Sequence, residues 1–401
     1  MNASVYLSAP GLTSALGDGL QAHIDALLNP SPTSPLAFSD QWVKGKSYAC
    51  GAVEQVLRPF PETLAASFRS RNNQLLWHAL AQIEGQIEEA KARFGAERVA
   101  VVIGTSTSGV DENIGMFRKV AEGAPWQDVS FKQAQQLMDA PAEFVAEVYG
   151  LQNVNYVVST ACTSGARALM SAARLLHAGL CDAVICGGVD TLSPLTINGF
   201  ASLEVLSNGL ASPFSVNRSG INIGEAAAVF VMTREADFCE SLPLLGYGAS
   251  SDAHHMSSPR PDGLGAVQAF QTALARAQIE AKSVGWINLH GTGTLHNDSM
   301  ESIAVAQVFG NDTPCTSTKP STGHTLGAAG AIEAAFLWGM VSRRCNPSGK
   351  LPPQIWDGCP DPALPAIGLT DLESHWQKQR RIGASSSFAF GGSNAVVIIG
   401  E

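Results

Sequence analysis

Long hydrophobic runs are missing from the sequence. No stretch reaches the roughly 20 uninterrupted apolar residues of a membrane-spanning helix, and the first residues, MNASVYLSAPGL, lack the basic-then-apolar order of a signal peptide. Closely spaced cysteines are missing as well. The eight cysteines include no C-x-x-C pair, which argues against a structural zinc site and a dense disulfide framework. These absences predict a cytoplasmic protein with reduced thiols.

Charged residues are also few. They make up 15% of the chain, whereas hydrophobic residues make up 45%. This apolar fraction is enough for a large buried interior and for contacts between subunits. The 25 Lys and Arg are outnumbered by 35 Asp and Glu, and the net charge of −10 argues against a general nucleic-acid-binding surface. We therefore expect an ordered protein that forms an oligomer.

Short apolar segments that end in glycine alternate with helical patterns. VAVVIG (99–104), DAVICGG (182–188) and AVVIIG (395–400) are typical of buried strands. Apolar residues at helical spacing predict an amphipathic helix over 73–93, before the first strand. An Ala- and Leu-rich segment predicts a second helix over 164–179, which ends at a glycine suited to a C-cap. This alternation predicts a layered α/β fold.

The middle of the chain suggests a loop and a boundary. Residues 207–224, SNGLASPFSVNRSGINIG, are rich in Ser, Gly and Asn and predict a functional or covering loop. Between residues 240 and 255, strand-like LPLLGYG gives way to a polar segment. We place the division there, between an N-terminal half of residues 1–245 and a C-terminal half of residues 246–401.

One segment places a cysteine where it can act as a nucleophile. In STACTSGARA (159–168), Cys162 lies between a strand-like run over 154–158 and the start of a helix. The positive end of that helix would favour the thiolate. A small buried thiol in a tight turn is the alternative, because cysteine is often a core residue.

Two further segments place histidines at strand or helix edges. WINLHGTGTLHND (286–298) has His290 directly after an apolar run, and TSTKPSTGHTLGAAGAIEA (316–334) has Lys319 and His324 ahead of a Gly- and Ala-rich helix. A lone histidine is more often a structural hydrogen-bonding residue. Neither segment matches the dinucleotide-binding pattern or the phosphate-binding P-loop, so nucleotide binding is not predicted.

Together these segments resemble the β-ketoacyl-acyl carrier protein synthases, which are condensing enzymes of the thiolase-like superfamily. TACTSG (160–165) resembles the nucleophile turn, HGTGTLHNDSME (290–301) the first histidine motif, STKPSTGHTLGAAG (317–330) the lysine and second histidine motif, and SSSFAFGGSNA (385–395) the C-terminal glycine loop. The resemblance covers essentially the whole chain. It implies a dimer and two similar halves, each with a mixed five-stranded sheet, in a five-layered α-β-α-β-α arrangement.

The resemblance also implies a decarboxylative Claisen condensation. Cys162 would accept an acyl group from acyl carrier protein, with the backbone N–H groups of Cys162 and Phe390 as oxyanion donors. Malonyl carrier protein would then lose carbon dioxide, and neutral His290 and His324 would stabilise the enolate. No metal and no bound cofactor is implied, since decarboxylation drives the reaction and the phosphopantetheine arm belongs to the carrier.

Further residues take supporting roles by the same resemblance. Lys319 would lie near His324 and Glu333 and disfavour histidine protonation, whereas an ordinary helical carboxylate is the alternative for Glu333. Thr292 and Thr294 would hydrogen-bond the phosphopantetheine arm, and the phenyl ring of Phe390 would gate the acyl channel. Other channel candidates are Phe200, Phe388, Ile114 and Met116. An acidic carrier needs a local basic patch, and the candidates are Arg69, Arg71, Arg118 and Lys119.

Several positions depart from the commonest family pattern. Thr163 stands where alanine is frequent, GEAAA (224–228) replaces GEGAG, AFGGSN (389–394) replaces GFGGTN, and RSG (218–220) replaces the RDG of primary fatty-acid elongators. These departures put a role in primary fatty acid synthesis in doubt and suggest a specialised type II pathway, such as one that builds polyenes, aryl polyenes or other secondary lipids or polyketides. The sequence leaves open whether the pathway is fatty acid synthesis or a specialised one.

Three other functions fit the sequence less well. A thiolase-type acyltransferase would need a second cysteine in a C-terminal C-x-G motif, and the C-terminal loop has none. A cysteine hydrolase would leave the second histidine and Lys319 unexplained. A non-catalytic chain-length factor would have lost the nucleophile. The sequence leaves open whether the chain forms a homodimer or is the catalytic half of a heterodimer with a chain-length factor.

Overall fold

Most strands belong to one long sheet. The computed structural model describes residues 4–401, and thirteen strands within them form this sheet. Its main path runs in spatial order through β14 (Gly368–Leu369), β13 (Pro314–Thr316), β12 (Trp286–Asn288), β15 (Ile382–Ala389), β16 (Ser393–Gly400), β11 (Ser241–Ser251), β1 (Tyr6–Ser8), β10 (Ala226–Thr233), β8 (Ala183–Asp190), β6 (Val99–Gly104) and β7 (Asn155–Val158). The short strands β2 (Gly11–Ser14) and β3 (Gly17–Asp18) extend it beside β10. A separate three-stranded sheet contains β4 (Ala37–Val43), β5 (Lys46–Gly51) and β9 (Ile223–Gly224).

The long sheet consists of two groups of strands joined at one short contact. β1 pairs antiparallel with β10 along one edge and with residues 241–243 of β11 along the other, while residues 244–251 of β11 pair with β16. The sheets of the two halves are thus continuous, because β1 is paired on both edges and joins them. The proposed division after residue 245 falls inside β11, at an irregularity in pairing between Leu244 and Gly246.

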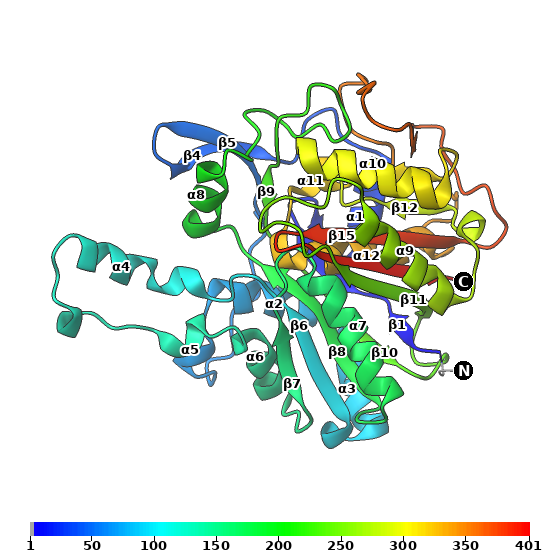
Figure 1. The fold of residues 1–401 in the computed structure, drawn as a ribbon. Helices are drawn as coiled ribbons and strands as arrows, with labels where there is room; N and C mark the ends of the chain where they lie inside the picture. The colour runs from blue at the N-terminus through cyan, green and yellow to red at the C-terminus, as the bar shows by residue number, and fades with distance from the viewer. Residues whose placement is uncertain (1–3) are drawn as a thin grey trace.

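Helices cover both groups of strands and fill the space between them (Figure 1). One outer layer contains α2 (Arg71–Ala81), α3 (Glu84–Phe94) and α6 (Ala140–Tyr149), the middle layer α7 (Ser164–His177) and α12 (Ala329–Val341), and the other outer layer α9 (Leu264–Ala277) and α10 (Leu295–Phe309). No helix within residues 4–401 combines the length and apolar character needed to cross a membrane. The five layers confirm the predicted layered α/β fold.

The buried strands have apolar residues on both faces. In β6, Val99, Val101 and Ile103 pack in the core with the outer helices, whereas Ala100 and Val102 pack in the core that contains α7 and α12. Strands of this kind show continuous apolar runs rather than alternation. The strand predictions at the positions of β6, β8 and β16 are confirmed for this reason.

The first predicted helix is two helices in the structure, α2 and α3. The chain leaves helical geometry at Ile83, and the side chain of Gln82 makes hydrogen bonds with both the N–H and the carbonyl of Leu12. This long-range contact cannot be seen in the apolar spacing. Five short strands also precede β6, so the helix does not come before the first strand. The second helix prediction is confirmed by α7, which is followed by Gly179 at φ 69°.

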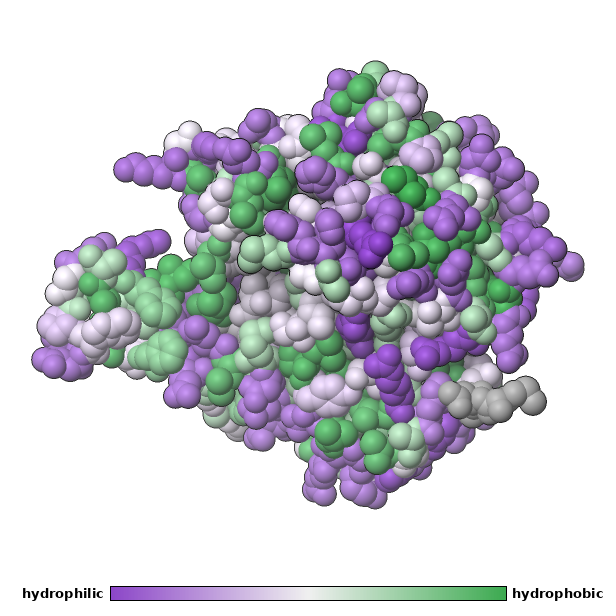
Figure 2. All heavy atoms as spheres, viewed as in Figure 1, coloured by the Kyte–Doolittle hydropathy of each residue, from purple (hydrophilic) through white to green (hydrophobic). Residues whose placement is uncertain are grey.

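The chain segment that connects β6 to β7 includes an arm that projects from the layers (Figure 1). We define it as residues 110–139, which include α4 (Ile114–Ala121) and α5 (Gln133–Gln136). Apolar side chains are interspersed with polar ones on its surface (Figure 2). The exposed Phe117 ring packs against the exposed rings of Trp126 and Phe131. Exposed aromatic clusters of this kind often mark interaction surfaces.

His23, in α1 (Leu20–Leu28), is a fully buried neutral histidine. Its Nδ1 lies 2.7 Å from the carbonyl oxygen of Gly19, and its Nε2 lies 2.8 Å from Ser14 Oγ. Because a carbonyl only accepts, Nδ1 carries the proton and Nε2 accepts from the Ser14 hydroxyl. Burial lowers the pKa of His23 to about 4, although the Gly19 carbonyl and the charge of Asp18 oppose the shift.

We expect His23 to reduce stability in mild acid. The unfolded chain binds a proton at this histidine below its ordinary pKa of 6.5, whereas the folded chain binds none until about 4. The stabilisation is therefore complete above pH 6.5 and is lost as the pH falls toward 4. The variant His23→Gln keeps a donor and an acceptor without the titration. The free energy of unfolding, measured with urea, should fall between about pH 7.5 and about pH 5 by ~2 kcal/mol more in the wild type than in the variant. An equal fall in both proteins would contradict this prediction.

Candidate active site

Cys162 lies in a sharp turn between β7 and α7, as the sequence predicted. Ala161, directly before it, adopts a left-handed conformation with φ 50°. The Ala161 carbonyl accepts hydrogen bonds from the N–H and the hydroxyl of Ser164, and the Ser164 oxygen accepts from the N–H of Thr160. These bonds hold a backbone conformation that costs energy in a residue with a side chain. The turn thereby presents the Cys162 thiol at the start of α7.

His324 contacts the thiol directly. Its Nε2 lies 3.0 Å from Cys162 Sγ, and its Nδ1 accepts a hydrogen bond from the backbone N–H of Leu326 at 3.3 Å. A ring nitrogen that accepts from a backbone N–H carries no proton of its own. In the neutral ring the proton is therefore on Nε2, which donates toward the sulfur.

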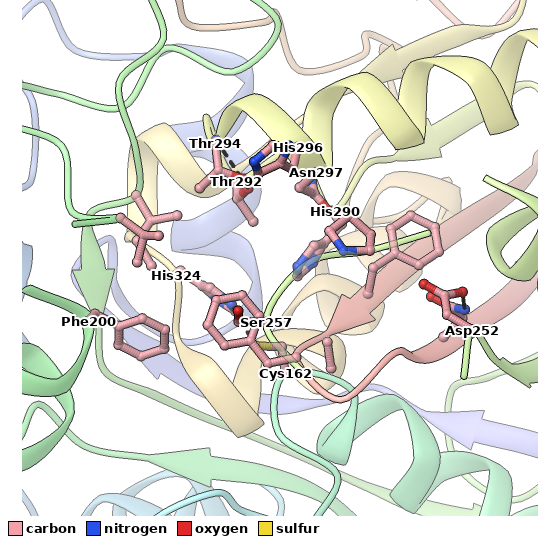
Figure 3. A pocket seen from close by; sticks show the side chains of 17 residues that line it. Cys162, Phe200, Asp252, Ser257, His290, Thr292, Thr294, His296, Asn297 and His324 are labelled. Carbon is pink, nitrogen blue, oxygen red and sulfur yellow. Dashed lines mark hydrogen bonds between the residues drawn. The ribbon is translucent and has the colours of Figure 1, made fainter. Parts of the chain in front are cut away.

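His290 and Lys319 complete the group. The His290 ring lies edge-to-face with the His324 ring, with centroids 5.2 Å apart, and both rings line one cavity above Cys162 (Figure 3). Lys319 Nζ lies 3.3 Å from His290 Nδ1 and 2.5 Å from Glu333 Oε1. Because an ammonium only donates, Nδ1 of His290 accepts and Nε2 carries the proton. The expected contact with Glu333 is present, but the hydrogen bond of Lys319 reaches His290 rather than His324.

Burial dominates the ionisation of these groups. It lowers the pKa values of His290 and His324 well below the ordinary value, and the positive charge of Lys319 lowers both further. Burial raises the pKa of the Cys162 thiol to about 12, although Lys319 and the N–H groups of Cys162 and Phe390 oppose this. The expectation of a thiolate favoured by the helix is therefore wrong for the unloaded site, because desolvation of the sulfur outweighs the helix end.

Alkylation of Cys162 should report this raised pKa. Iodoacetamide reacts with the thiolate, whose fraction grows about tenfold per pH unit below the thiol pKa. We expect the alkylation rate at Cys162 to rise by about that factor per unit from neutral pH to about pH 9 without a plateau. Mass spectrometry of the modified peptide measures the rate. A rate that is already level near neutral pH would show a stabilised thiolate instead.

The cavity above Cys162 is small and lies behind a wider opening. It measures about 80 Å³ and is lined in part by apolar and threonine side chains that the sequence predicted, namely Phe200, Phe388, Phe390, Thr292 and Thr294. The phenyl rings of Phe200 and Phe390 lie 5.9 Å apart. An opening of about 390 Å³ shares Val205, Ser257, Thr294, His296 and Phe390 with this cavity. Ile114 and Met116 do not line it but lie on the arm in α4.

Two buried carboxylates that the sequence analysis did not single out hold the loop after β12. The Glu301 carboxylate accepts hydrogen bonds from the backbone N–H groups of His290 and Gly291. The Asp298 carboxylate accepts hydrogen bonds from those of Thr292 and Gly293. Burial raises the pKa of Glu301 to about 7, while the hydrogen bonds it accepts act in the opposite direction. Both residues stand within the first histidine motif, HGTGTLHNDSME (290–301), which was the available signal.

A third buried carboxylate, Asp190, ties the two halves of the chain together. It accepts hydrogen bonds from the N–H groups of Ser106 and Thr107 and from that of Gly327, in the turn between His324 and α12. Burial raises the pKa of Asp190, and its hydrogen bonds oppose the shift. Asp190 thus fixes the segment that carries His324 against the loop that follows β6.

The four candidate residues for a basic patch do not lie in equivalent settings. Arg69 donates to the backbone carbonyls of residues 61, 62 and 64, and Arg71 forms an ion pair with buried Glu225 at 2.5 Å. Arg118 and Lys119 are exposed on α4 in the arm. Only the latter two project from the body of the molecule.

The cysteine and metal-ligand side chains show no further centre in the described part of the chain. All eight cysteines, including Cys162, are free thiols. Residues 4–401 contain no group of three or more His, Cys, Asp or Glu side chains placed to hold a metal ion.

Comparison with known proteins identifies the family. The model for the N-terminal domain of β-ketoacyl synthases matches residues 70–237, and the model for their C-terminal domain matches residues 243–349. A 3-oxoacyl-[acyl-carrier-protein] synthase 2 of Rhizobium meliloti is 31% identical over 318 residues, which cover 75% of this chain and 73% of the relative. A putative mitochondrial 3-oxoacyl-[acyl-carrier-protein] synthase of Schizosaccharomyces pombe is 33% identical over 65% of this chain and 64% of its own length.

Solved structures agree with this result. A ketosynthase in complex with its chain length factor from Xenorhabdus doucetiae matches with a TM-score of 0.92 and 43% identity, over 99% of this chain and 98% of the solved one. The ishigamide ketosynthase/chain length factor matches with a TM-score of 0.86 and 25% identity, over 100% and 99%. The fold and these matches define an acyltransferase of the condensing type. The chain belongs to the β-ketoacyl synthase family.

Proposed function

We propose that this chain joins an acyl group held on Cys162 to malonyl-acyl carrier protein, releasing carbon dioxide and β-ketoacyl-acyl carrier protein. The observation that carries the proposal is one buried cavity lined by Cys162, His290 and His324, with Lys319 behind the histidines. Each histidine carries its proton on Nε2, because Lys319 donates to Nδ1 of His290 and the Leu326 N–H donates to Nδ1 of His324. A nucleophile and two neutral N–H donors are what the two steps of the condensation require.

In the first step the Cys162 sulfur attacks the thioester carbonyl of the acyl carrier. The negative charge that develops on the carbonyl oxygen is stabilised by the N–H groups of Cys162 and Phe390, which both face the sulfur. The carrier thiolate leaves and takes up the proton that Cys162 loses. The acyl group remains on Cys162 as a thioester.

In the second step malonyl carrier protein loses carbon dioxide. The electron pair of the broken bond forms an enolate. The enolate oxygen accepts hydrogen bonds from the Nε2–H groups of His290 and His324. Its carbon then attacks the acyl thioester, and the new carbon–carbon bond forms as the Cys162 thiolate leaves. The thiolate then takes one proton from water, which restores the thiol. Burial and the charge of Lys319 keep the histidines neutral, so that no additional positive charge accumulates in the site.

The shape of the site supports entry of a carrier arm. The phosphopantetheine arm would pass through the wider opening and meet Thr292 and Thr294, whose hydroxyls lie 3.0 Å apart. Phe390 borders both the opening and the inner cavity. Because the inner cavity is far smaller than the roughly 300 Å³ of a typical ligand site, the Phe390 ring must move away from Phe200 to admit an acyl chain. Phe390 thus acts as a gate as well as an oxyanion donor.

Acyl carrier protein is the partner that delivers both substrates, and no bound cofactor or metal takes part in this scheme. Arg118 and Lys119, exposed on the arm, are the better candidates for attracting an acidic carrier. Arg71 is a weaker candidate because Glu225 already neutralises its charge. Arg69 is held by backbone carbonyls, which leave its charge uncompensated but restrict its movement.

A second, homologous subunit completes the assembly in this proposal. The exposed aromatic residues of the arm suit a subunit contact, and two matched structures are described as ketosynthases with chain length factors. The partner is another copy of this chain or a chain-length factor. The 43% identity with the Xenorhabdus doucetiae ketosynthase, solved with a chain length factor, exceeds the 31% identity with the Rhizobium meliloti synthase, which supports pairing with a chain-length factor. Eight free thiols suit the reducing cytoplasm.

The net reaction tests the proposal. The chain, alone and after co-expression with a homologous subunit, is incubated with a panel of acyl carrier thioesters and malonyl carrier protein. We expect carbon dioxide release together with a β-ketoacyl carrier two carbons longer, and neither product with Cys162→Ala. Carbon dioxide release without chain elongation, or no product from either preparation of the folded protein, would overturn it.

A further inference from the structure

The residue that follows the nucleophile contacts the strand that follows the C-terminal glycine loop. Thr163 is fully buried, and its Oγ1 lies 2.7 Å from the carbonyl oxygen of Thr160, 2.9 Å from the Oγ1 of Thr160 and 2.9 Å from Ser393 Oγ. The single proton of the Thr163 hydroxyl goes to the carbonyl, which can only accept. The Ser393 hydroxyl therefore donates to Thr163 Oγ1. This contact joins the two halves of the chain beside Cys162.

Each partner of this contact is next to one oxyanion donor. Thr163 directly follows Cys162, whose N–H is the first donor. Ser393 is paired across the hairpin with Ala389, which directly precedes Phe390, whose N–H is the second donor. The contact therefore connects the two donors by a short path. The path runs from Cys162 to the adjacent Thr163, across the hydroxyl contact to Ser393, and through the Ser393–Ala389 pair to Phe390.

The loop that carries the second donor needs such an anchor. Phe390, Gly391 and Gly392 form the tip of the β15–β16 hairpin, and both glycines adopt left-handed conformations with φ 82° and 75°. Glycine gives the backbone more conformations than any other residue. On its other side the tip is held by hydrogen bonds from Gly391 N–H to the Met256 carbonyl and from Asp252 N–H to the Gly392 carbonyl. None of these bonds relates Phe390 to the nucleophile turn.

We infer that Thr163 and Ser393 form a positioning pair that sets the geometry of the oxyanion hole of Cys162. The inference rests on the proposed function, since it assigns the pair to acyl transfer through a tetrahedral intermediate. Neither residue touches the reacting atoms. Their hydroxyl contact holds the N–H of Phe390 where the oxyanion forms, and loss of the contact lets the glycine tip move relative to Cys162.

Two reactions at the same sulfur separate this role from a merely structural one. Acyl transfer from acyl carrier protein forms an oxyanion, whereas alkylation by iodoacetamide displaces iodide and forms none. In Ser393→Ala and in Thr163→Val we expect the acyl-transfer rate constant to fall about tenfold, with the KM for acyl carrier within about twofold of wild type. The alkylation rate should fall clearly less than the transfer rate, because displacement of the Phe390 N–H affects alkylation only through the pKa of the thiol. Ser393→Thr and Thr163→Ser, which keep the hydroxyls, should retain most of the transfer rate.

The double variant tests whether the residues act as one unit. Ser393→Ala combined with Thr163→Val should be no slower than the slower single variant, because one contact is lost only once. Wild-type transfer rates in Ser393→Ala, or an equal fall of transfer and alkylation, would overturn the inference. If Thr163→Val does not fold, Ser393→Ala at the hairpin end carries the test. Normal alkylation of wild type without any acyl transfer would instead overturn the proposed function, and the inference with it.

Discussion

The variant His290→Ala is expected to load an acyl group on Cys162 and then to fail in elongating it. The thiol contacts His324 and the N–H groups of Cys162 and Phe390, none of which this change removes. Loading should therefore stay within about threefold of wild type. The enolate loses one of its two N–H donors, so elongation should fall about 10²- to 10³-fold. Quenched single-turnover reactions, in which intact mass is followed over time, measure both rates.

Two other histidine variants serve as controls for this prediction. His324→Ala should slow loading as well as elongation, because His324 Nε2 lies 3.0 Å from the sulfur. His296→Ala removes an exposed imidazole that lines the same cavity without contacting Cys162, and it should elongate normally. Elongation by His290→Ala at the wild-type rate, or an equal loss of loading and elongation, would contradict the assignment.

Replacing Lys319 with methionine is expected to lower the elongation rate by about 10²-fold. In the wild type the ammonium donates to His290 Nδ1 and so keeps the proton of the ring on Nε2. Without it, no donor at Nδ1 holds the proton of the ring on Nε2, and the tautomer that carries the proton on Nδ1 becomes accessible. Nε2 then lacks the proton that the enolate requires. Steady-state kcat at saturating malonyl carrier protein measures the loss.

A double variant separates this effect from a loss of folding. Lys319→Met leaves the Glu333 carboxylate buried without its partner, which destabilises a protein. Lys319→Met with Glu333→Gln removes the uncompensated charge, so its melting temperature should recover toward that of wild type while kcat stays low. Glu333→Gln alone keeps the Lys319 donor and should lose less than about tenfold. Recovery of kcat in the double variant would show that Lys319 acts only on stability.

The sequence was informative about the fold where burial is uniform. The strands β6, β8 and β16 could be predicted because both faces are buried and the sequence shows unbroken apolar runs. The break between α2 and α3 could not, because it coincides with hydrogen bonds between the Gln82 side chain and the backbone of Leu12, in a distant strand. The pairing of β1 with both β10 and β11 likewise depends on tertiary contacts of a three-residue strand.

The site, like the fold, could be predicted in part from the sequence. Cys162, His290, Lys319 and His324 stand in short segments rich in Gly and Thr, and the structure brings them together as the resemblance implied. The catalytic roles assigned to them stay predictions. The anchoring of the loops by buried carboxylates such as Glu301 escaped prediction, because it depends on which backbone N–H groups face each carboxylate. The protonated state of the thiol escaped it for a related reason, since the extent of its burial is not encoded in its neighbours along the chain.

The intact mass of the protein tests the central claim most directly. Wild type and Cys162→Ala are incubated with acyl carrier thioesters, and malonyl carrier protein is then added. We predict an adduct with the mass of the acyl group on wild type alone, which disappears after the second addition as carbon dioxide and a carrier two carbons longer appear. An acyl adduct that also forms on Cys162→Ala, or a wild-type adduct that malonyl carrier protein does not clear, would contradict the account.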